Sequence, residues 1–345
     1  MPRSPFLLLA LFVPTLALAQ EPWDRPAFSA EPKELLAAAA KIDSGDHDAV
    51  VLLDEAVYTF DADGRSRTVA RLMYRITGEP AVAPMGQINI PWSPWYHEKP
   101  TVAARVVTKN GSVHLLDQSA LTEAAASPDS LDIFSDDRLL RAPLPAVEIG
   151  SVVEYVVTEV GRGPLADAGM AHTYHFGSNY PVHRIRLVLD APADMQPRIV
   201  NRSGVEPRVE EKDGRRRTVF ESARVEAIDE VEENLPFDVS PIPHVSFATG
   251  KSWGDIARRY AEIVDRQIAN SELQKLVRGA VGNATDRKEI VARILAAIQK
   301  DIRYAGVEVG EGSIIPRTPK SVLANKYGDC KDKAALLVAM LREAG

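Results

Sequence analysis

The sequence predicts a mostly β N-terminal domain, an antiparallel β-sandwich, followed by a helical C-terminal part. Between Ala49 and Ile228, apolar and polar residues alternate in short runs separated by turn-forming residues, as half-buried strands require. From Ser252 onward, apolar residues recur at helical spacing instead. A chain of 345 residues is long enough for two domains that each bury a core.

The strand signals follow one another with turn chemistry between them. "AVVLLDEAVYTF" and "RTVARLMYRITGE" flank "DADGRS", which is typical of a hairpin, and "TVAARVVTKNGSVHLLD" contains an Asn110-Gly111 turn. "GSVVEYVVTEV", "HRIRLVLD" and "RRTVFESARV" continue the pattern. We therefore expect a sandwich or barrel-like domain over residues 49–245. An N-terminal extension, residues 20–48, precedes it and contains a short helix around Lys33–Ile42.

The proline-rich stretch "EVEENLPFDVSPIPHVSFATGKSW" predicts an irregular linker. The second domain, residues 246–345, then begins. Its first helix has Ser252 as N-cap, and "DRKEIVARILAAIQKDIRY" predicts another with Asp286 near its start. A helical turn at Ser321–Ala324 precedes a last helix over Cys330–Ala344.

The first residues, "MPRSPFLLLALFVPTLALAQ", have the pattern of a secretory signal. The apolar run from Phe6 to Ala19 is too short to span a bilayer comfortably and ends in Ala17-Leu18-Ala19, which signal peptidase accepts. We predict a signal peptide over residues 1–19, cut after Ala19, and a periplasmic or secreted protein. The alternative is a buried N-terminal helix. No later segment is long and apolar enough to cross a membrane, so we expect no span after cleavage.

The composition excludes several classes of protein. The formal net charge of −7 argues against general attraction to nucleic acid or anionic lipid. No set of Cys, His or Asp has zinc spacing, and no calcium or nucleotide loop is present, so we predict no metal and no cofactor. His172 and His175 are three apart and would point to opposite faces of a strand, which argues against a shared metal.

One short segment is rich in aromatic residues. "IPWSPWYHEK" contains Trp92, Trp95 and Tyr96. We expect these rings to close one end of the sandwich, and the alternative is that they stack on a sugar or on a partner.

Cys330 is the single cysteine, so it cannot form a disulfide within its own chain. Gly328 allows a sharp turn and Asp329 can cap the helix that follows. Cys330 then faces the free N–H groups of the first helical turn, and Lys331 and Lys333 add positive charge nearby, which favours the thiolate. The alternatives are a thiol that only packs in the core and one that pairs with another chain.

"DIRYAGVEVGEGSIIPRTPKSVLANKYGDCKDKAALLVAMLREAG" resembles the first half of a transglutaminase-like core domain. In that superfamily a Gly-Asp-Cys turn opens the central helix of a papain-like α+β fold. "VEIGSVVEYVVTE" and the strands before it resemble the β-rich domain of unknown function that precedes this core in bacterial exported proteins. The resemblance implies that Cys330 is the nucleophile of a Cys-His-Asp triad. Its thiolate would attack a glutamine carboxamide or a peptide carbonyl, and an amine or water would resolve the thioester. The Cys330 backbone N–H would then serve as an oxyanion donor.

The sequence departs from this family after Cys330. The family's histidine and aspartate lie downstream of the cysteine helix, whereas no histidine follows Cys330 here. The seven histidines are His47, His97, His114, His172, His175, His183 and His244. His244 is nearest in sequence, but nothing in "SPIPHVSF" predicts that its ring is held as a base. We therefore expect an incomplete papain-like core and a chain that is inactive as written, because most of a triad's rate advantage needs the base.

An incomplete core has a structural consequence. The face of the last helix that a missing sheet would cover is expected to be exposed and available for self-association. It includes some of Leu336, Leu337, Met340 and Leu341.

The sequence thus predicts an exported, transglutaminase-like protein of the cysteine acyltransferase or peptidase type, acting on a protein or peptide. The alternative from another class is a non-catalytic binding or scaffold module of the cell envelope.

Overall fold

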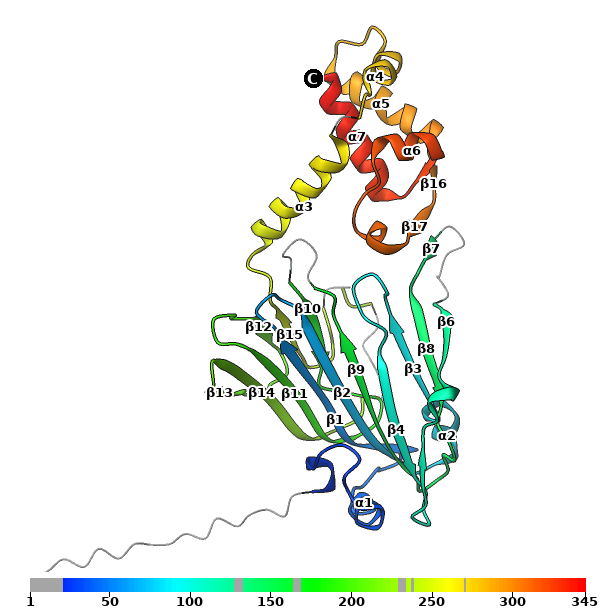
Figure 1. Ribbon diagram of the computed structural model, residues 1–345, viewed down its shortest axis with the longest axis vertical. Coiled ribbons are helices and arrows are strands. Elements are labelled where there is room, and N and C mark those ends of the chain that lie inside the picture. The colour runs from blue at the N-terminus through cyan, green and yellow to red at the C-terminus, as the bar shows by residue number, and fades with distance from the viewer. Residues whose placement is uncertain (1–20, 127–132, 164–168, 229–233, 237–238, 270) are drawn as a thin grey trace, which may run out of the picture.

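The computed structural model describes residues 21–126, 133–163, 169–228, 234–236, 239–269 and 271–345. The predicted signal peptide lies outside these ranges. A β domain carries a helical lobe above one end of its strands (Figure 1). The predicted fold class, mostly β and then helical, is confirmed.

The β domain is built on one large sheet with the strand order β13-β14-β11-β1-β2-β9-β4-β5. The strands are β1 (Ala49–Phe60), β2 (Ser66–Ile76), β4 (Thr101–Val107), β5 (Val113–Leu115), β9 (Val152–Val160), β11 (Val182–Pro192), β13 (Arg208–Lys212) and β14 (Arg215–Val225). All neighbours are antiparallel except β1 and β11, which run parallel with Val51 opposite Val182. The predicted antiparallel arrangement therefore holds in this sheet except at the β1–β11 pair at its centre. The cause is a crossover, because the chain passes through strand β10 of the other layer before it enters β11.

Two three-stranded sheets form the second layer. One has the order β10-β15-β12, with β10 at Ala171–His175, β15 at His244–Ala248 and β12 at Arg198–Asn201. The other has the order β3-β8-β6, with β3 at Gln87–Trp92, β8 at Arg138–Pro143 and β6 at Thr122–Ala125, and the short helix α2 (Glu79–Met85) precedes it. Their apolar side chains share one core with the large sheet.

Strand β15 lies within the segment predicted to be an irregular linker, so that prediction is wrong for residues 244–248. Val245 and Phe247 point into the core, where Phe247 packs edge-on to Tyr58 and Phe60 at centroid distances of 4.8 and 6.3 Å. Two inward residues among prolines are too short a pattern to stand out in the sequence. The predicted boundary at residue 245 falls inside this strand.

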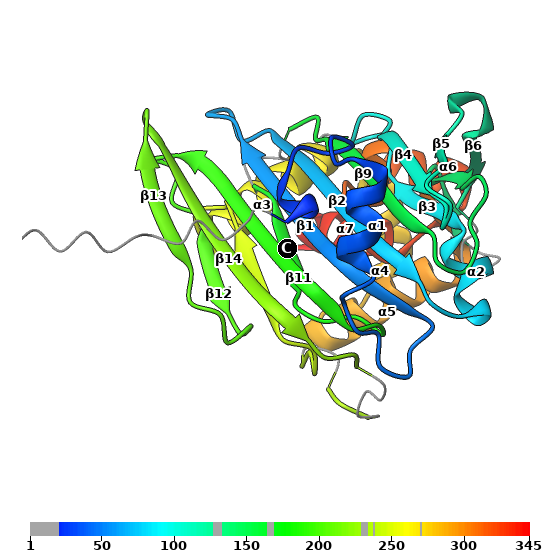
Figure 2. The same ribbon diagram turned by 90° about the horizontal axis from the view of Figure 1, so that it is seen from below.

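The N-terminal extension covers the other face of the large sheet (Figure 2). It contains the 3-10 turn η1 (Pro22–Asp24) and helix α1 (Pro32–Ala39), close to the helix expected at Lys33–Ile42. Trp23 and Leu35 are completely buried in this second core. The extension is therefore part of the β domain.

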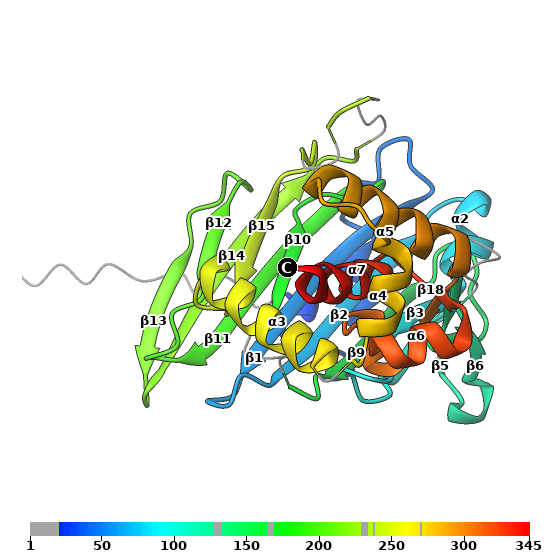
Figure 3. The same ribbon diagram turned by 90° about the horizontal axis from the view of Figure 1, so that it is seen from above.

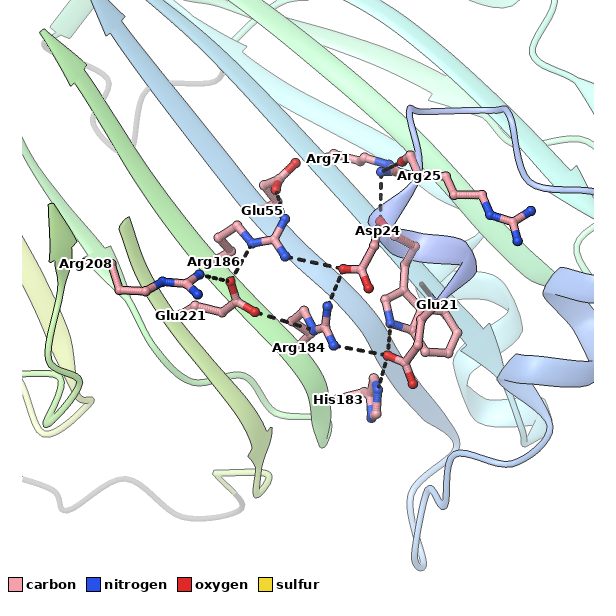
Figure 4. A network of polar contacts seen from close by, with 11 residues as sticks. Glu21, Asp24, Arg25, Glu55, Arg71, His183, Arg184, Arg186, Arg208 and Glu221 are labelled. Carbon is pink, nitrogen blue, oxygen red and sulfur yellow. Dashed lines mark hydrogen bonds and ion pairs between the residues drawn. The ribbon is translucent and has the colours of Figure 1, made fainter. Parts of the chain in front are cut away.

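Ion pairs fasten the start of the extension to the sheet (Figure 4). Arg184 of β11 pairs with Glu21 and with Asp24, the Glu21 contact being 3.2 Å long. Arg186, two residues further along β11, lies 2.8 Å from Glu55 and 3.0 Å from Glu221. The network thus joins η1, β1, β11 and β14.

A buried carboxylate, Glu154 of β9, also lies against the extension and has no exposed surface. Its oxygens accept from Arg71 Nη2 at 2.6 Å and from Arg105 Nε at 2.8 Å. The two guanidinium groups also donate to backbone carbonyls of the extension, Arg71 to Trp23 and Arg105 to Ala30, both at 3.0 Å. The N-terminal segment therefore supplies acceptors for guanidinium N–H groups that Glu154 does not bind.

A second acid lies between the two layers. Asp54 of β1 accepts a 2.7 Å hydrogen bond from Tyr174 Oη of β10, and burial raises the pKa of Asp54. Because the folded-state pKa is above the unfolded value, this group favours folding most below the unfolded pKa, and that contribution is lost as pH rises through the folded pKa.

We expect Asp54→Asn to stabilise the protein at neutral pH, since the amide oxygen still accepts from Tyr174 but carries no charge. Urea denaturation should give a higher midpoint than wild type near pH 7 and a smaller gain near pH 4. Asp54→Ala, which leaves the Tyr174 hydroxyl without its acceptor, is the comparison. A loss of stability in Asp54→Asn at both pH values would contradict the prediction.

The helical lobe has its own core. Its helices are α3 (Trp253–Ile268), α4 (Gln274–Val281), α5 (Arg287–Asp301), α6 (Pro319–Asn325) and α7 (Cys330–Ala344), and Figure 3 shows them over the ends of the strands. Ser252 and Asp286 cap α3 and α5 as predicted. Each helix of the described part of the lobe is too short or too polar to cross a membrane.

Of the four apolar residues of the last helix among which exposure was expected, two are buried. Leu336 and Met340 are each 1% exposed because they pack in the lobe's core with residues of α4, α5 and α6. Leu337 and Leu341 are partly buried, and Val338 is 37% exposed. The remaining exposed apolar surface of the helix therefore lies on Leu337, Val338 and Leu341.

Candidate active site

Cys330 is the first residue of α7, and its side chain is exposed. The chain reaches it through β18 (Tyr327–Gly328), which pairs in parallel with β16 (Arg303–Tyr304). The lobe thus presents the thiol at the N-terminus of a helix packed in its core, as predicted. The alternative of a thiol that only packs in the core is wrong.

The first turn of α7 is held by a reciprocal cap. The Asp329 carboxylate accepts from the backbone N–H of Lys331 at 3.1 Å and of Asp332 at 3.2 Å. The Asp332 carboxylate accepts from the backbone N–H of Asp329 in return, at 3.4 Å. Both aspartates are buried, and the ammonium group of Lys331 pairs with Asp329. The Lys331 ammonium group is therefore paired with the Asp329 carboxylate, which reduces the effect of its positive charge on the thiol.

Arg317 anchors the cap from outside the helix. Its backbone N–H and its Nη1 donate to the two oxygens of Asp332, at 2.7 and 2.8 Å. Its Nη2 donates to the carbonyl of Val307. Neither Arg317 nor Asp332 was predicted from the sequence. Asp332 carries a signal, because Asp329 and Asp332 have capping-box spacing, whereas nothing local marks Arg317.

Gly328 is needed for a different reason from the one predicted. A Cβ at this position would lie 2.8 Å from Asp332 Cβ and 3.3 Å from its Oδ2, so the close approach of the buried acid requires glycine. The left-handed residue is Lys326, with φ of 61°, at the C-terminal end of α6.

The structure brings no histidine into hydrogen-bonding contact with Cys330 among the residues that it describes. His244 lies in β15, with Nδ1 2.9 Å from the Ile242 carbonyl oxygen and its ring 6.0 Å from that of His175. His172 packs instead on Tyr58, at 5.3 Å between centroids. In the described ranges, no three His, Cys, Asp or Glu side chains are grouped so that they could hold a metal ion.

A cleft of about 550 Å³ lies between the β domain and α3. Trp95 and Tyr96 line one side, and Tyr96 is 38% exposed, so they do not simply plug the sandwich. Trp92 packs against the main core. The opposite side is formed by apolar residues of the lobe, namely Ile256, Tyr260, Ile263 and Ile314. No Asp, Glu, Lys or Arg lines the described cleft.

The fold and the site define a β domain that carries a helical lobe with an exposed, capped cysteine. Residues 62–229 match the family described as a domain of unknown function with solved structure, DUF3857. Residues 274–345 match the transglutaminase-like superfamily. The chain therefore combines a segment similar to the DUF3857 domain with one similar to the transglutaminase-like superfamily, and the predicted resemblance is confirmed.

A similar fold occurs in the crystal structure of a candidate protease from Parabacteroides distasonis. It is 16% identical with a TM-score of 0.67, and the match covers 86% of this chain and 59% of that one. The chain thus spans somewhat over half the length of that protein, and the likeness shows the fold alone.

Two further solved structures are much less alike. Aminopeptidase A of Legionella pneumophila, in complex with aspartic acid, is 10% identical with a TM-score of 0.30, covering 61% of this chain and 22% of that one. A zinc metallopeptidase of Deinococcus radiodurans is also 10% identical with a TM-score of 0.30, covering 66% and 55%. No curated protein matches the sequence.

Proposed function

We propose that Cys330 is the nucleophile of a cysteine-dependent acyl transfer or amide hydrolysis on protein or peptide substrates. The observation that carries the proposal is an exposed thiol at the first position of a helix whose opening turn is fixed by Asp329, Asp332 and Arg317. The transglutaminase-like match over residues 274–345 supports the same chemistry.

The local geometry favours this chemistry. Asp329 accepts the N–H groups of Lys331 and Asp332, while the N–H of Cys330 makes no hydrogen bond in the described part of the chain. That N–H is therefore available to a developing oxyanion. The thiolate would add to a carboxamide carbon, ammonia or an amine would leave, and a thioester to Sγ would remain. Water or a primary amine would then release the acyl group.

Turnover, in this proposal, needs a general base that the described residues do not bring to Cys330. Without such a base, Cys330 would form the thioester slowly and would not cycle. A glutamine-containing peptide and a fluorescent primary amine would test this. Incorporation of amine at many equivalents per protein would contradict the proposed dependence on a further base.

The nucleophile itself is tested by alkylation of Cys330 with iodoacetamide on residues 20–345. We expect the native thiol to react several-fold faster than the same thiol in urea at the same pH, because the first turn of α7 holds it exposed beside free backbone N–H groups. Intact mass counts the label, and Cys330→Ser is the control that must not react. Equal or slower alkylation of the native protein would contradict the proposal and favour the non-catalytic binding module, for which the uncharged cleft would be the candidate surface.

Export is part of the proposal, with the protein in the periplasm or secreted. It rests on the signal-like pattern of residues 1–19, and a cut after Ala19 would leave in place the contacts of Glu21 with Arg184 and His183, at 3.2 and 3.1 Å. N-terminal sequencing of the exported protein should begin at Gln20. A cytoplasmic protein that retains residues 1–19 would contradict it.

A further inference from the structure

The helical lobe is joined to the β domain by a short pair of strands. Strand β17 (Gly306–Glu308) lies parallel to β7 (Ile133–Ser135), with Val307 opposite Phe134. Figure 1 shows β7 extending from the β domain to the underside of the lobe, where β17 lies beside it.

A carboxylate closes this junction. Asp136 directly follows β7, and its Oδ2 accepts a 2.9 Å hydrogen bond from the backbone N–H of Gly310. Gly310 begins the 3-10 turn η4 (Gly310–Ser313) with φ of 58°, and its N–H has no other acceptor in the described chain. The second oxygen of Asp136 is buried without a hydrogen-bond partner there. Burial of an incompletely paired carboxylate is unfavourable, so its place at this junction calls for a role beyond packing.

Strand β17 is also connected to the turn that carries Cys330, through side-chain hydrogen bonds. The Val307 carbonyl of β17 accepts from Arg317 Nη2, and Arg317 holds both oxygens of Asp332. Asp332 in turn caps the backbone of Asp329, the residue before Cys330. An unbroken series of hydrogen bonds and strand pairing therefore runs from the β domain to the first turn of α7.

We propose that Asp136 is a positioning residue for Cys330. Through Asp136, the β domain keeps the first turn of α7, which carries the thiol, in one conformation. The proposal rests on the proposed function of Cys330. Asp136 fixes Gly310 and so keeps β17 paired with β7, and paired β17 presents the Val307 carbonyl to Arg317. Without Asp136, Arg317 loses one of its fixed acceptors, and the cap of α7 loosens.

The test compares Asp136→Ala, Asp136→Asn and Asp63→Ala with wild type. The rate of Cys330 alkylation should fall about fivefold in Asp136→Ala. A change of that size corresponds to the net contribution of about one hydrogen bond. Asp136→Asn should restore most of the rate, since its amide oxygen still accepts from Gly310. Asp63→Ala is the matched control, because Asp63 lies in an exposed turn beside Arg65. The thermal midpoint should change little in all three.

Amide hydrogen exchange separates this proposal from the proposed function. In Asp136→Ala, protection should fall both at residues 306–312 and at residues 329–332, whether or not the wild-type thiol is unusually reactive. Wild-type protection at residues 329–332 in Asp136→Ala, or an Asp136→Asn variant as impaired as the alanine, would overturn the coupling. An unreactive wild-type thiol with the predicted exchange pattern would overturn only the proposed function.

Discussion

Replacement of Glu154 by alanine is expected to lower the free energy of unfolding of the β domain by about 3–5 kcal/mol. The variant removes the shared partner of Arg71 and Arg105, whose side chains are only 8% and 5% exposed. Two guanidinium groups would then be buried without a counter-ion, which is far less favourable than the loss of the pair itself. Urea denaturation followed by far-UV circular dichroism measures the effect.

Glu123→Ala provides the control, since Glu123 pairs with Lys99 at 2.9 Å on the surface. We expect that change to stay within about 1 kcal/mol. Glu154→Gln should fall between the two, because the amide keeps an acceptor but not the charge. A Glu154→Ala variant as stable as Glu123→Ala would show that the N-terminal carbonyls alone satisfy both arginines.

Arg317→Ala is expected to have the second-largest effect, lowering the stability of the helical lobe by about 2–3 kcal/mol. Asp332 has no exposed surface, and the variant takes away its cationic partner together with the link to Val307. Alkylation of Cys330 should slow in the same variant. Hydrogen exchange of α7 and the alkylation rate measure the two consequences.

Arg342→Ala is the comparison for this prediction. Arg342 also belongs to α7 and pairs with Asp265 at 2.7 Å, but both side chains are more than half exposed, at 60% and 54%. Its removal should change stability by less than about 1 kcal/mol. Arg317→Lys should recover little, since one ammonium group cannot reproduce a planar fork with several donors. Equal effects of Arg317→Ala and Arg342→Ala would refute the role of the buried pair.

The sequence predicted the long strands of the β domain because they carry enough alternating residues to define an inward face. Strand β15 was missed because only Val245 and Phe247 mark it. The parallel pairing of β1 with β11 was also missed, since both strands show the same alternation whichever direction their neighbour runs. Pairing direction depends on the path of the chain through the second layer, which no local pattern records.

The residues of the candidate site likewise fall into those that the sequence predicts and those that it does not. Cys330, its position in the helix and the Asp329 cap follow from adjacent residues and were predicted. Arg317 is 15 residues from Asp332, and Asp136 is 174 residues from Gly310. Such contacts arise only when separate elements pack together, and a loop arginine or a loop aspartate looks the same in the sequence whether it is exposed or anchors a helix.

The parallel contact between β1 and β11 also has a consequence for how fast this protein reaches its native state. Glu55 and Arg186, which pair across these strands, are 131 residues apart, and Glu21 and Arg184 are 163 apart. Closing so long a loop costs conformational entropy before the contacts between its ends can form. Domains of high contact order therefore fold slowly. During synthesis, the hairpin of β1 and β2 is complete long before β11 exists, and one edge of β1 stays open throughout that interval. The centre of the sheet can thus close only after β11 has been made, and until then the open edge of β1 is exposed to mispairing with other nascent chains.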